Sequence, residues 1–339
     1  MVTQSLSTPH KPAIAIIGAG SWATALVKIL SEGAVDIRWW LRNQESLEHI
    51  RRYQRNPDYL SDVPINPEKV QLFADMKEAV QGAQYVIIAI PAAFVQDALS
   101  QLSAADFKDK VLVSAVKGIV PQKNWLITEL LEYEYQVKPA HICVIAGPCH
   151  AEEVALEKQS YLTIASEDLA QAENFAQLIA NRFIKAVPNQ DVYGVEYSAV
   201  MKNIIALACG IAHGLNYGDN FQAVLVSNAM QEIRRFVETT YPCERDLYAS
   251  AYLGDLLVTA YSQFSRNRTF GNMIGRGYTV KSAQMEMNMI AEGYYAVKSI
   301  YEINQKFGVD MPITKAVYQI LYEKVTPGVA IGKLRWLLA

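Results

Sequence analysis

A lysine in the middle of a strongly apolar segment is the feature of this sequence best suited to proton transfer. The stretch 199–208 reads AVMKNIIALA and is apolar on nearly all sides, which predicts a buried helix that carries Lys202 and Asn203. Burial lowers the pKa of a lysine, and an amine that titrates near neutrality can act as a general acid or base. The alternative is a structural lysine paired with a carboxylate such as Glu196.

Two segments further along the chain carry groups suited to a phosphorylated ligand. Asp255 and Thr259 stand four residues apart, on one face of a predicted helix. The segment 265–271 reads SRNRTFG, and its arginines, asparagine and hydroxyls are donors of the kind that bind phosphate. A solvated loop is the alternative for this segment. A compact basic cluster in an acidic chain favours a small phosphorylated metabolite over a polymer.

A glycine-rich turn near the N-terminus has the spacing of a dinucleotide-binding loop. Residues 18–23 read GAGSWA, which fits the pattern GxGxxG/A and follows an apolar run at 13–17. In this pattern Gly18 allows the tight turn, Gly20 allows close approach of a pyrophosphate, and Ala23 allows close packing of helix on strand. A plain glycine-rich turn is the alternative.

The end of the second predicted strand bears on the choice of cofactor. An acidic residue there favours NAD, whereas an arginine accommodates the 2′-phosphate of NADP. The acidic residue is missing here, and Arg42 follows the strand at 36–41. We therefore expect NADPH or NADH as the cofactor, with NADPH preferred. An ordinary surface arginine is the alternative.

Two more strand ends carry polar residues. Lys117 follows the run at 111–116, and the segment 147–153, GPCHAEE, follows the run at 142–146. Ligands of doubly wound folds bind beyond the carboxyl ends of the strands, so Lys117 is well placed for an anionic substrate. A solvent-exposed lysine is the alternative. His150 is expected to be a hydrogen-bonded structural residue.

Two different kinds of element must position these residues. Short apolar runs separated by helical segments predict an α/β domain with a doubly wound, mainly parallel sheet. The runs are 13–17, 36–41, 85–90, 111–116, 142–146 and 161–165. From about Val192, longer periodicities predict an all-α domain with helices at 196–211, 223–239, 252–261 and 282–307. We place the dinucleotide-binding domain at 1–190 and the helical substrate domain at 191–339.

Composition excludes several classes of protein. The chain has 339 residues, 51% hydrophobic, which is enough for two domains with a sizeable core. Its net charge of -3 and pI near 6.0 argue against a general nucleic-acid binder. The four cysteines stand far apart, which predicts free thiols and no metal site. With no signal-peptide pattern and no spanning apolar run, we expect a cytoplasmic protein.

Taken together, the motifs resemble those of bacterial NAD(P)-dependent glycerol-3-phosphate dehydrogenases. The matching stretches follow the family's order: GAGSWATAL at 18–26, SAVKG at 114–118, GPCHAEEVA at 147–155, AVMKNIIALACGIAHG at 199–214, YLGDLLVT at 252–259, SRNRTFG at 265–271, AEGYYA at 291–296 and MPI at 311–313. The resemblance implies a Rossmann domain followed by an all-α domain of the 6-phosphogluconate-dehydrogenase-like type. It also implies a homodimer that reversibly reduces dihydroxyacetone phosphate to sn-glycerol 3-phosphate, supplying glycerophospholipid synthesis.

The same resemblance implies a role for each matching position. Lys202 would be the general acid–base residue, oriented by Asp255, and Lys117 would contact both substrate and cofactor. The implied substrate-binding residues are Lys117, Gly147, Cys149, Lys202, Asn203, Asp255, Thr259, Ser265, Arg266 and Asn267. The implied cofactor-binding residues are Gly18, Gly20, Ser21, Trp22, Arg42, Lys117, Ala151, Arg266, Ile290 and Glu292.

The chain departs from the family's pattern at a few positions. Ala23 replaces a glycine that is more usual there, and His213 replaces an aspartate. Cys149 replaces a serine or threonine, so a weak thiol donor takes the place of a hydroxyl. The stretch 216–228 lacks the arginines common in the family. These departures bear on substrate geometry and on subunit contacts.

Two other functions compete with this interpretation. A related β-hydroxyacid or 6-phosphogluconate-type dehydrogenase would share the architecture and the Lys202–Asn203 pair. The stretches SRNRTFG and GPCHAEEVA argue against it. A non-catalytic NADPH-binding regulator would bind the cofactor without turnover.

Overall fold

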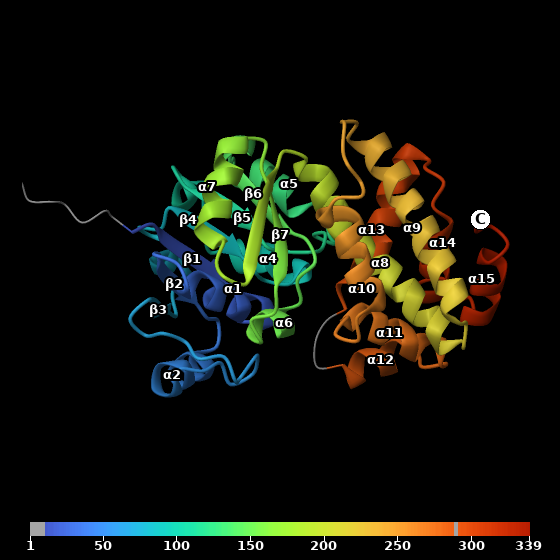
Figure 1. The fold of residues 1–339 in the computed structure, drawn as a ribbon, viewed down its shortest axis with the longest axis horizontal. Helices are drawn as coiled ribbons and strands as arrows, with labels where there is room; N and C mark the ends of the chain where they lie inside the picture. The colour runs from blue at the N-terminus through green and yellow to red at the C-terminus, as the bar shows by residue number, and fades with distance from the viewer. Residues whose placement is uncertain (1–10, 288–290) are drawn as a thin grey trace, which may run out of the picture.

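An eight-stranded sheet forms the centre of the N-terminal half of the chain (Figure 1). The computed structural model describes residues 11–287 and 291–339. The strand order is β3-β2-β1-β4-β5-β6-β7-β8, and all neighbours are parallel except β6 and β7. The strands are β1 (Ala13–Ile17), β2 (Asp36–Trp40), β3 (Val70–Phe73), β4 (Tyr85–Ile88), β5 (Val111–Ser114), β6 (Ile142–Ala146), β7 (Ser160–Ala165) and β8 (Ile184–Asn189). The predicted doubly wound, mainly parallel sheet is confirmed.

Helices cover both faces of this sheet because successive side chains of a strand point to opposite faces. Ile14 and Ile16 of β1 pack in a core with α1, α2 and α7. Ala15 and Ile17 pack in a second core with α3, α4 and α5. The helices are α1 (Ser21–Ser31), α2 (Gln44–Tyr53), α3 (Met76–Val80), α4 (Ala92–Leu99), α5 (Ile127–Tyr133), α6 (Ala151–Ala155) and α7 (Leu169–Ile179), with short 3-10 turns η1 (Ala104–Phe107) and η2 (Pro139–His141).

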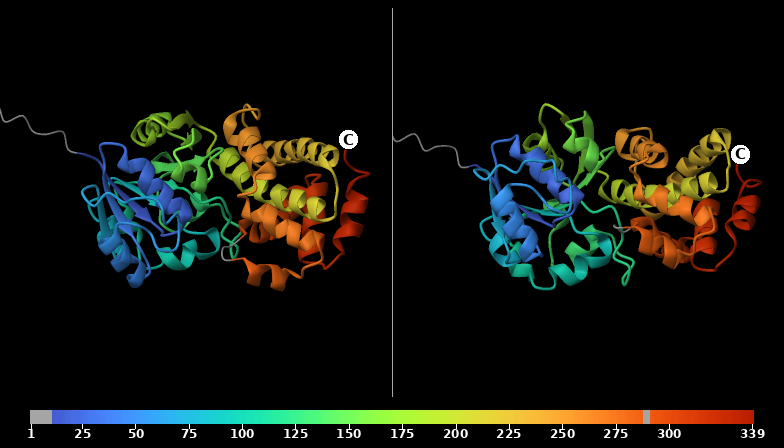
Figure 2. Two further views of the ribbon diagram at one scale, coloured as in Figure 1. Left: turned by 60° about the horizontal axis from the view of Figure 1, so that its bottom comes forward. Right: turned by 90° about the horizontal axis from the view of Figure 1, so that it is seen from below.

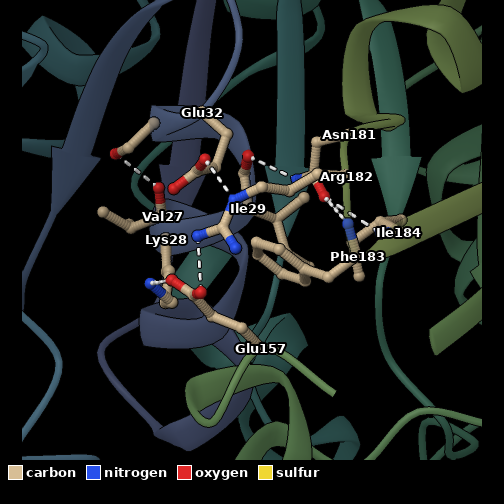
Figure 3. Close-up of polar contacts among 10 residues, drawn as sticks. Val27, Lys28, Ile29, Glu32, Glu157, Asn181, Arg182, Phe183 and Ile184 are labelled. Carbon is tan, nitrogen blue, oxygen red and sulfur yellow. Dashed lines mark hydrogen bonds and ion pairs between the residues drawn. The ribbon is translucent and has the colours of Figure 1, made fainter. Parts of the chain in front are cut away.

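Ion pairs join α1 to the segments around β7 and β8 (Figure 3). Lys28 Nζ lies 2.8 Å from one carboxylate oxygen of Glu157, and Arg182 Nη2 lies 2.5 Å from the other. Arg182 also approaches Glu32 at 3.4 Å. Asn181 donates to the α1 backbone at 3.1 Å. These contacts connect the end of α6 to the helix that begins at the glycine-rich turn.

The C-terminal half is built around α8 (Val192–Gly214), a 23-residue helix that is buried over almost its whole length. By length and composition α8 is able to cross a membrane, but that stretch is entirely buried inside the protein, as expected of a core helix. The helices packed around or beyond it are α9 (Asp219–Thr240), α10 (Asp255–Tyr261), α11 (Arg266–Gly275), α12 (Val280–Glu286), α13 (Glu292–Phe307), α14 (Pro312–Leu321) and α15 (Pro327–Leu334).

Glycines allow α8 and α11 to pack backbone against backbone. A Cβ atom at Gly210 would lie 2.1 Å from the carbonyl oxygen of Arg268, and one at Gly271 would lie 2.3 Å from that of Leu207. Both distances are too short for a real side chain, so only glycine fits at this contact. The approach sets the start of α11 beside the middle of α8, where Lys202 lies.

The two halves meet along a small apolar cluster. Strand β8 ends at Asn189 and α8 begins at Val192, so the chain crosses from one half to the other within a few residues. Both views in Figure 2 show the start of α8 at the junction of the two lobes. The cluster contains Val144, Ala146, Ala165, Val192, Val195, Ala199, Ala251 and Tyr252.

Several elements differ from the sequence-based prediction. The predicted helix 282–307 is two helices, α12 ending at Glu286 and α13 beginning at Glu292. The sequence pattern predicts neither β3 nor β8. The segment 265–271 is not a loop, because Ser265 is the N-cap of α11.

Candidate active site

A cleft of about 200 Å³ opens where the carboxyl ends of β1, β4 and β5 face helices α8, α10 and α11. Residues from both halves of the chain therefore line one cavity. The cleft is lined by these residues of the implied site: Gly20, Ser21, Trp22, Lys117, Cys149, Ala151, Lys202, Asn203, Asp255, Thr259, Ser265, Arg266, Asn267 and Glu292.

A second cavity of about 620 Å³ continues from the cleft along the ends of β1 and β2. The two cavities share Gly20, Ser21, Ile90, Pro91 and Arg266, among others, so they form one groove. The second cavity is also lined by Gly18, Ala19, Trp40, Arg42, Asn43, Ser46, Asp58, Tyr59, Ala89, Phe94, Asp97, Ala98 and Gln101. A groove of this length suits an extended ligand that reaches from the glycine-rich turn to the cleft.

Two residues of the implied site are not among those that line the groove. Gly147 lies behind Lys117, and its carbonyl oxygen accepts a hydrogen bond from Lys117 Nζ at 3.2 Å. Gly147 therefore orients the lysine. Ile290 lies outside the described residues.

One carboxylate stands between two lysines at the bottom of the cleft. Lys202 Nζ donates to Oδ1 of Asp255, and the two side chains are only 5% and 1% exposed. Lys117 Nζ lies 3.6 Å from Oδ2 of the same carboxylate. The alternative pairing of Lys202 with Glu196 is wrong, because Glu196 accepts instead from the hydroxyl of Thr128 at 2.5 Å.

Because the two lysines share one negative charge, their pKa values shift in opposite directions. Burial, reinforced by the neighbouring Lys117 ammonium, lowers the pKa of Lys202 to about 8, although Asp255 opposes that shift. Against the cost of its own burial, the Asp255 carboxylate keeps the pKa of Lys117 above its ordinary value. Lys202 is therefore the lysine that exchanges its proton near neutral pH, while Lys117 remains an ammonium.

The segment after β6 places a thiol and an imidazole at the same end of the cleft. Cys149 lies 3.9 Å from Lys117 Nζ, and burial raises the pKa of its thiol. His150, expected to be a hydrogen-bonded structural residue, lines the cleft instead. Its Nε2 is buried and has no hydrogen-bond partner in the described part of the chain. Burial, with the charges of Lys202 and Lys117, lowers the pKa of His150, so its imidazole is neutral.

The N-terminus of α11 lies on the opposite wall and has groups suited to an anion. The Ser265 hydroxyl caps the helix by accepting from the amide of Arg268 at 3.3 Å. Asn267 Oδ1 accepts from the backbone amide of Gly293 at 2.9 Å. The NH₂ of the Asn267 side chain is then the group left to donate to a ligand. The exposed amides of a helix N-terminus, together with Arg266 in the first turn, attract a negatively charged group.

Two hydrogen bonds across the junction fix the walls of the cleft relative to each other. Asn203 on α8 donates to the carbonyl oxygen of Lys117 at 2.9 Å. Glu292, the first residue of α13, accepts from the amide of Ala92 at 3.0 Å. Burial raises the pKa of Glu292 to about 7. Its second oxygen is buried and has no hydrogen-bond partner among the described residues, so a ligand donor would satisfy it.

The glycine-rich turn fits a dinucleotide. Gly18 has φ +138°, and a Cβ there would lie 2.3 Å from the carbonyl oxygen of Ala89. A Cβ at Gly20 would meet no atom within 4 Å, so the missing side chain leaves open space at the start of α1. Trp22 Nε1 is buried without a partner in the part of the chain that the structure describes. Space, helix amides and an unpaired donor together suit a pyrophosphate and its attached ring.

The groove also contains residues that the sequence motifs do not indicate. Asp58 and Tyr59 reach it from the loop after α2. Asn56 holds this loop against the glycine-rich turn, because its side chain donates to the carbonyl oxygen of Ala19 at 3.0 Å and to the Thr24 hydroxyl at 2.8 Å. The contact between this loop and the glycine-rich turn leaves no periodic pattern in the sequence. An asparagine next to a proline is the local feature that marks it.

Within residues 11–287 and 291–339, no group of three or more histidine, cysteine, aspartate or glutamate side chains is arranged to hold a metal ion. The four cysteines are unpaired, with Cys143, Cys149 and Cys209 buried and Cys243 exposed.

Comparison with protein families accounts for almost the whole chain. The model of the N-terminal part of NAD-dependent glycerol-3-phosphate dehydrogenase matches residues 13–172, and the model of its C-terminal part matches residues 191–332. The chain belongs to this family. The match confirms the predicted family and the prediction of a nicotinamide-dependent dehydrogenase.

Individual relatives agree with this membership. A glycerol-3-phosphate dehydrogenase (NAD(P)+) of Exiguobacterium sp. is 36% identical over 322 residues, covering 95% of this chain and 94% of the relative. One of Clostridium botulinum is 35% identical over 321 residues, covering 95% and 96%. The crystal structure of glycerol-3-phosphate dehydrogenase from Coxiella burnetii superimposes with a TM-score of 0.89 at 30% identity, covering 96% of this chain and 98% of that one. The predicted fold class is thereby confirmed.

Proposed function

We propose that this chain catalyses the reversible reduction of dihydroxyacetone phosphate to sn-glycerol 3-phosphate with NAD(P)H. The observation that carries the proposal is the buried Lys202–Asp255 pair. It lies in a cleft that also contains the glycine-rich turn and the N-terminus of α11. A dinucleotide groove, a proton donor and an anion site therefore meet in one cavity.

The anion site would hold the substrate by its phosphate. Ser265, Arg266 and Asn267 line the cleft at the start of α11 and present charged and polar donors there. Anchoring the phosphate at this end fixes the carbonyl carbon at a defined place in the cleft. Restricting the substrate in this way converts binding energy into orientation, which accelerates the chemical step.

Lys202 would act at the ketone oxygen. The bound cofactor supplies the hydride for the carbonyl carbon. The Lys202 ammonium donates its proton to the oxygen as negative charge develops there, which completes the secondary alcohol. Asp255 holds the ammonium in place, and Lys117 contributes a second positive charge to the developing alkoxide. In the reverse direction the neutral Lys202 amine takes the hydroxyl proton.

The remaining residues would shape the pocket around the substrate and cofactor. Thr259 donates to the Asp255 carbonyl oxygen at 2.7 Å, and Asn203 binds the Lys117 backbone, so both support the charged centre. Cys149 would border the substrate. The proposed cofactor contacts are Gly18, Gly20, Ser21, Trp22, Arg42, Lys117, Ala151, Arg266 and Glu292.

NADPH is the proposed preference. Arg42 lines the far end of the groove, where a guanidinium can bind the 2′-phosphate with two parallel hydrogen bonds. The carboxylate of Asp58 lines the same cavity, held by the Ser46 hydroxyl at 3.0 Å. It offers an acceptor to a ribose hydroxyl and repels a phosphate. Use of NADH as a second cofactor is therefore expected.

Oxidation of NADPH and NADH with dihydroxyacetone phosphate tests the proposal. Rapid oxidation with this substrate, and slow oxidation with 3-oxoacids such as semialdehyde acids, is the expected result. Preference for those acids would favour the β-hydroxyacid dehydrogenase alternative. Tight binding of NADPH without oxidation of any of these substrates would favour the regulator.

We further propose the cellular setting that the resemblance implies. The chain would form a cytoplasmic homodimer without a membrane span or a nucleic-acid partner, and its product would supply glycerophospholipid synthesis. Residues 1–190 would bind the cofactor and residues 191–339 would bind the substrate. Light scattering of the purified protein tests the dimer, since a monomer mass at working concentration would contradict it.

A further inference from the structure

A buried ion pair lies at the junction of the two lobes, outside the residues that line the groove. Arg245 Nε donates to one carboxylate oxygen of Asp191 at 2.7 Å, and Nη2 donates to the other at 3.1 Å. The side chains are 2% and 11% exposed. Arg245 Nη2 also donates to the carbonyl oxygen of Tyr241 at 2.7 Å. Paired by both nitrogens in this way, the guanidinium has a single well-defined orientation.

Tyr252 is the third member of this network. Its hydroxyl donates to Asp191 at 2.7 Å, and its ring packs in the apolar cluster that joins β6 and β7 to α8. Asp191 is also the N-cap of α8, because its carboxylate accepts from the amide of Gly194 at 3.0 Å. The network thus ties Tyr252 to the helix that carries Lys202.

Tyr252 lies in an unusual turn that leads directly to Asp255. The segment η3 (Ser250–Gly254) is a π-helical turn, in which the amide of Asp255 donates to the carbonyl oxygen of Ser250, five residues earlier. A π-turn holds one residue more than an α-turn and is frequently found at functional sites. If η3 tightened to an ordinary α-turn, the side chain of Asp255 would swing about 100° around the helix axis.

We propose that Asp191, Arg245 and Tyr252 are positioning residues that hold η3 open and so keep the Asp255 carboxylate between Lys202 and Lys117. None of the three is among the residues that line the groove, so their effect on the site is indirect. The inference rests on the acid–base role of Lys202 proposed above.

Tyr252→Phe is the direct test, because it removes one hydroxyl and leaves the ring in its apolar cluster. With Asp255 less firmly placed, burial of Lys202 is less well compensated, and the pKa of Lys202 should fall by about one unit. This pKa can be measured without turnover. Only a neutral amine reacts with acetic anhydride, so trace acetylation over a pH series, followed by peptide mass spectrometry, gives the titration of Lys202.

A lower pKa of Lys202 should slow reduction at alkaline pH only, whereas a general loss of structure would slow it at every pH. A fall of one unit in the pKa of Lys202 lowers the protonated fraction about tenfold at alkaline pH and hardly at all in acid. Reduction of dihydroxyacetone phosphate by Tyr252→Phe should therefore be close to wild type near pH 6 and fall increasingly behind as the pH rises. The KM for NADPH should not change.

Two further variants complete the test. Tyr193→Phe is the matched control, because it removes a hydroxyl at the same junction that donates to Glu132 at 3.0 Å and has no bond to Asp191. It should leave the Lys202 titration unchanged. Arg245→Lys keeps the charge but loses the two-pronged contact, so it should shift the titration in the same direction as Tyr252→Phe.

An unchanged titration of Lys202 in folded Tyr252→Phe and Arg245→Lys would overturn the proposal, as would an equal shift in Tyr193→Phe. Circular dichroism and thermal melting establish that each variant is folded. The acetylation needs no substrate, so failure of the wild type to reduce dihydroxyacetone phosphate would contradict the proposed function and leave this test intact.

Discussion

The charge state of the site depends on two lysines that share the single carboxylate of Asp255. One carboxylate cannot fully compensate two buried ammonium groups, so one lysine must give up its proton more easily than an isolated lysine does. The more deeply buried Lys202 is the lysine that loses its proton more easily, and Lys117 keeps its charge. A proton donor and a permanent cation thus lie side by side, which suits the reduction of a carbonyl group.

This arrangement predicts opposite pH dependences for the two directions of the reaction. The pKa of Lys202 is lowered to about 8. Reduction needs the ammonium form, so its rate should fall as the pH rises through about 8, whereas oxidation of glycerol 3-phosphate needs the neutral amine and should rise. The pH dependence of kcat/KM in each direction, measured from about pH 6 to about pH 10, tests this, because kcat/KM reports the pKa of the free enzyme. A reduction rate that stays level over that range would contradict the assignment.

A second residue-scale prediction concerns the choice of cofactor. Arg42→Ala should weaken binding of NADPH roughly tenfold and leave binding of NADH nearly unchanged, because only NADPH offers a 2′-phosphate to the guanidinium. Asp58→Asn should strengthen binding of NADPH by removing a negative charge from the same cavity. Titration calorimetry with both cofactors measures these effects. Arg52→Ala, an exposed arginine of α2 outside the groove, is the control, and equal losses for both cofactors in Arg42→Ala would speak against the role of Arg42.

At the scale of elements, the close contact of α8 and α11 sets the distance between the proposed proton donor and the proposed anion site. Lys202 lies in the middle of α8, and the anion site is the first turn of α11. Glycines at the contact remove the side chains that would otherwise separate the two helices. A change in their spacing would move Arg266 and Asn267 relative to Lys202.

Gly271→Ala should therefore destabilise the protein and impair catalysis together. Its new Cβ would lie 2.3 Å from the backbone of Leu207, so the helices must separate, at a cost of about 1–3 kcal/mol in the free energy of unfolding. The KM for dihydroxyacetone phosphate should rise. Urea unfolding and steady-state kinetics measure the two effects.

Gly332→Ala on α15 is the matched control for this substitution. No atom lies within 4 Å of its Cβ position, so alanine should stabilise that helix by about 0.5–1 kcal/mol. If Gly271→Ala behaved like Gly332→Ala, the close contact would not be required.

Elements with contiguous apolar residues are the ones that could be predicted from the sequence. The buried strands β1, β4 and β6 read as uninterrupted apolar runs, as expected in the middle of a parallel sheet. Strand β3 is a four-residue edge strand, and β8 contains Pro188, which an edge position tolerates but which argues against a strand. The break between α12 and α13 interrupts a periodicity that continues on both sides, so the pattern does not reveal it.

The candidate site likewise has parts that the sequence predicts and parts that it does not. Lys202 stands out because a charge in an apolar helix conflicts with its surroundings, and the glycine-rich turn has a fixed spacing. The implied set of contacts came from the resemblance to the family. The Asp191–Arg245–Tyr252 network joins residues 54 and 61 positions apart, and no local pattern marks such contacts.

At the scale of the whole molecule, the buried carboxyl group of Glu196 links the two lobes. It lies on α8, and it accepts hydrogen bonds from the hydroxyl of Thr128 at 2.5 Å and the amide of Ile127 at 3.2 Å on α5. Burial raises the pKa of Glu196 from 4.5 to about 8. The folded protein therefore keeps a proton that the unfolded chain releases, which makes stability dependent on pH.

The stability that comes from the protonated Glu196 is fully present below about pH 4.5 and is lost as the pH rises through about 8. Glu196→Gln removes the ionisation, so its free energy of unfolding relative to wild type should increase from about pH 5.5 to about pH 8.5. Urea unfolding at both pH values measures this difference. Glu323→Gln, at an exposed position, is the control and should differ from wild type by the same amount at both pH values. If the difference between Glu196→Gln and wild type were also the same at both pH values, the prediction would be contradicted.

The proposed reduction of dihydroxyacetone phosphate depends on Lys202 as the source of the proton. The most direct test mixes NADPH-saturated wild type and Lys202→Ala rapidly with dihydroxyacetone phosphate and follows a single turnover by NADPH absorbance. Lys202→Ala should slow this step by at least about a hundredfold, while the dissociation constant for NADPH stays nearly the same. A single-turnover rate in Lys202→Ala close to that of the wild type would contradict this role of Lys202.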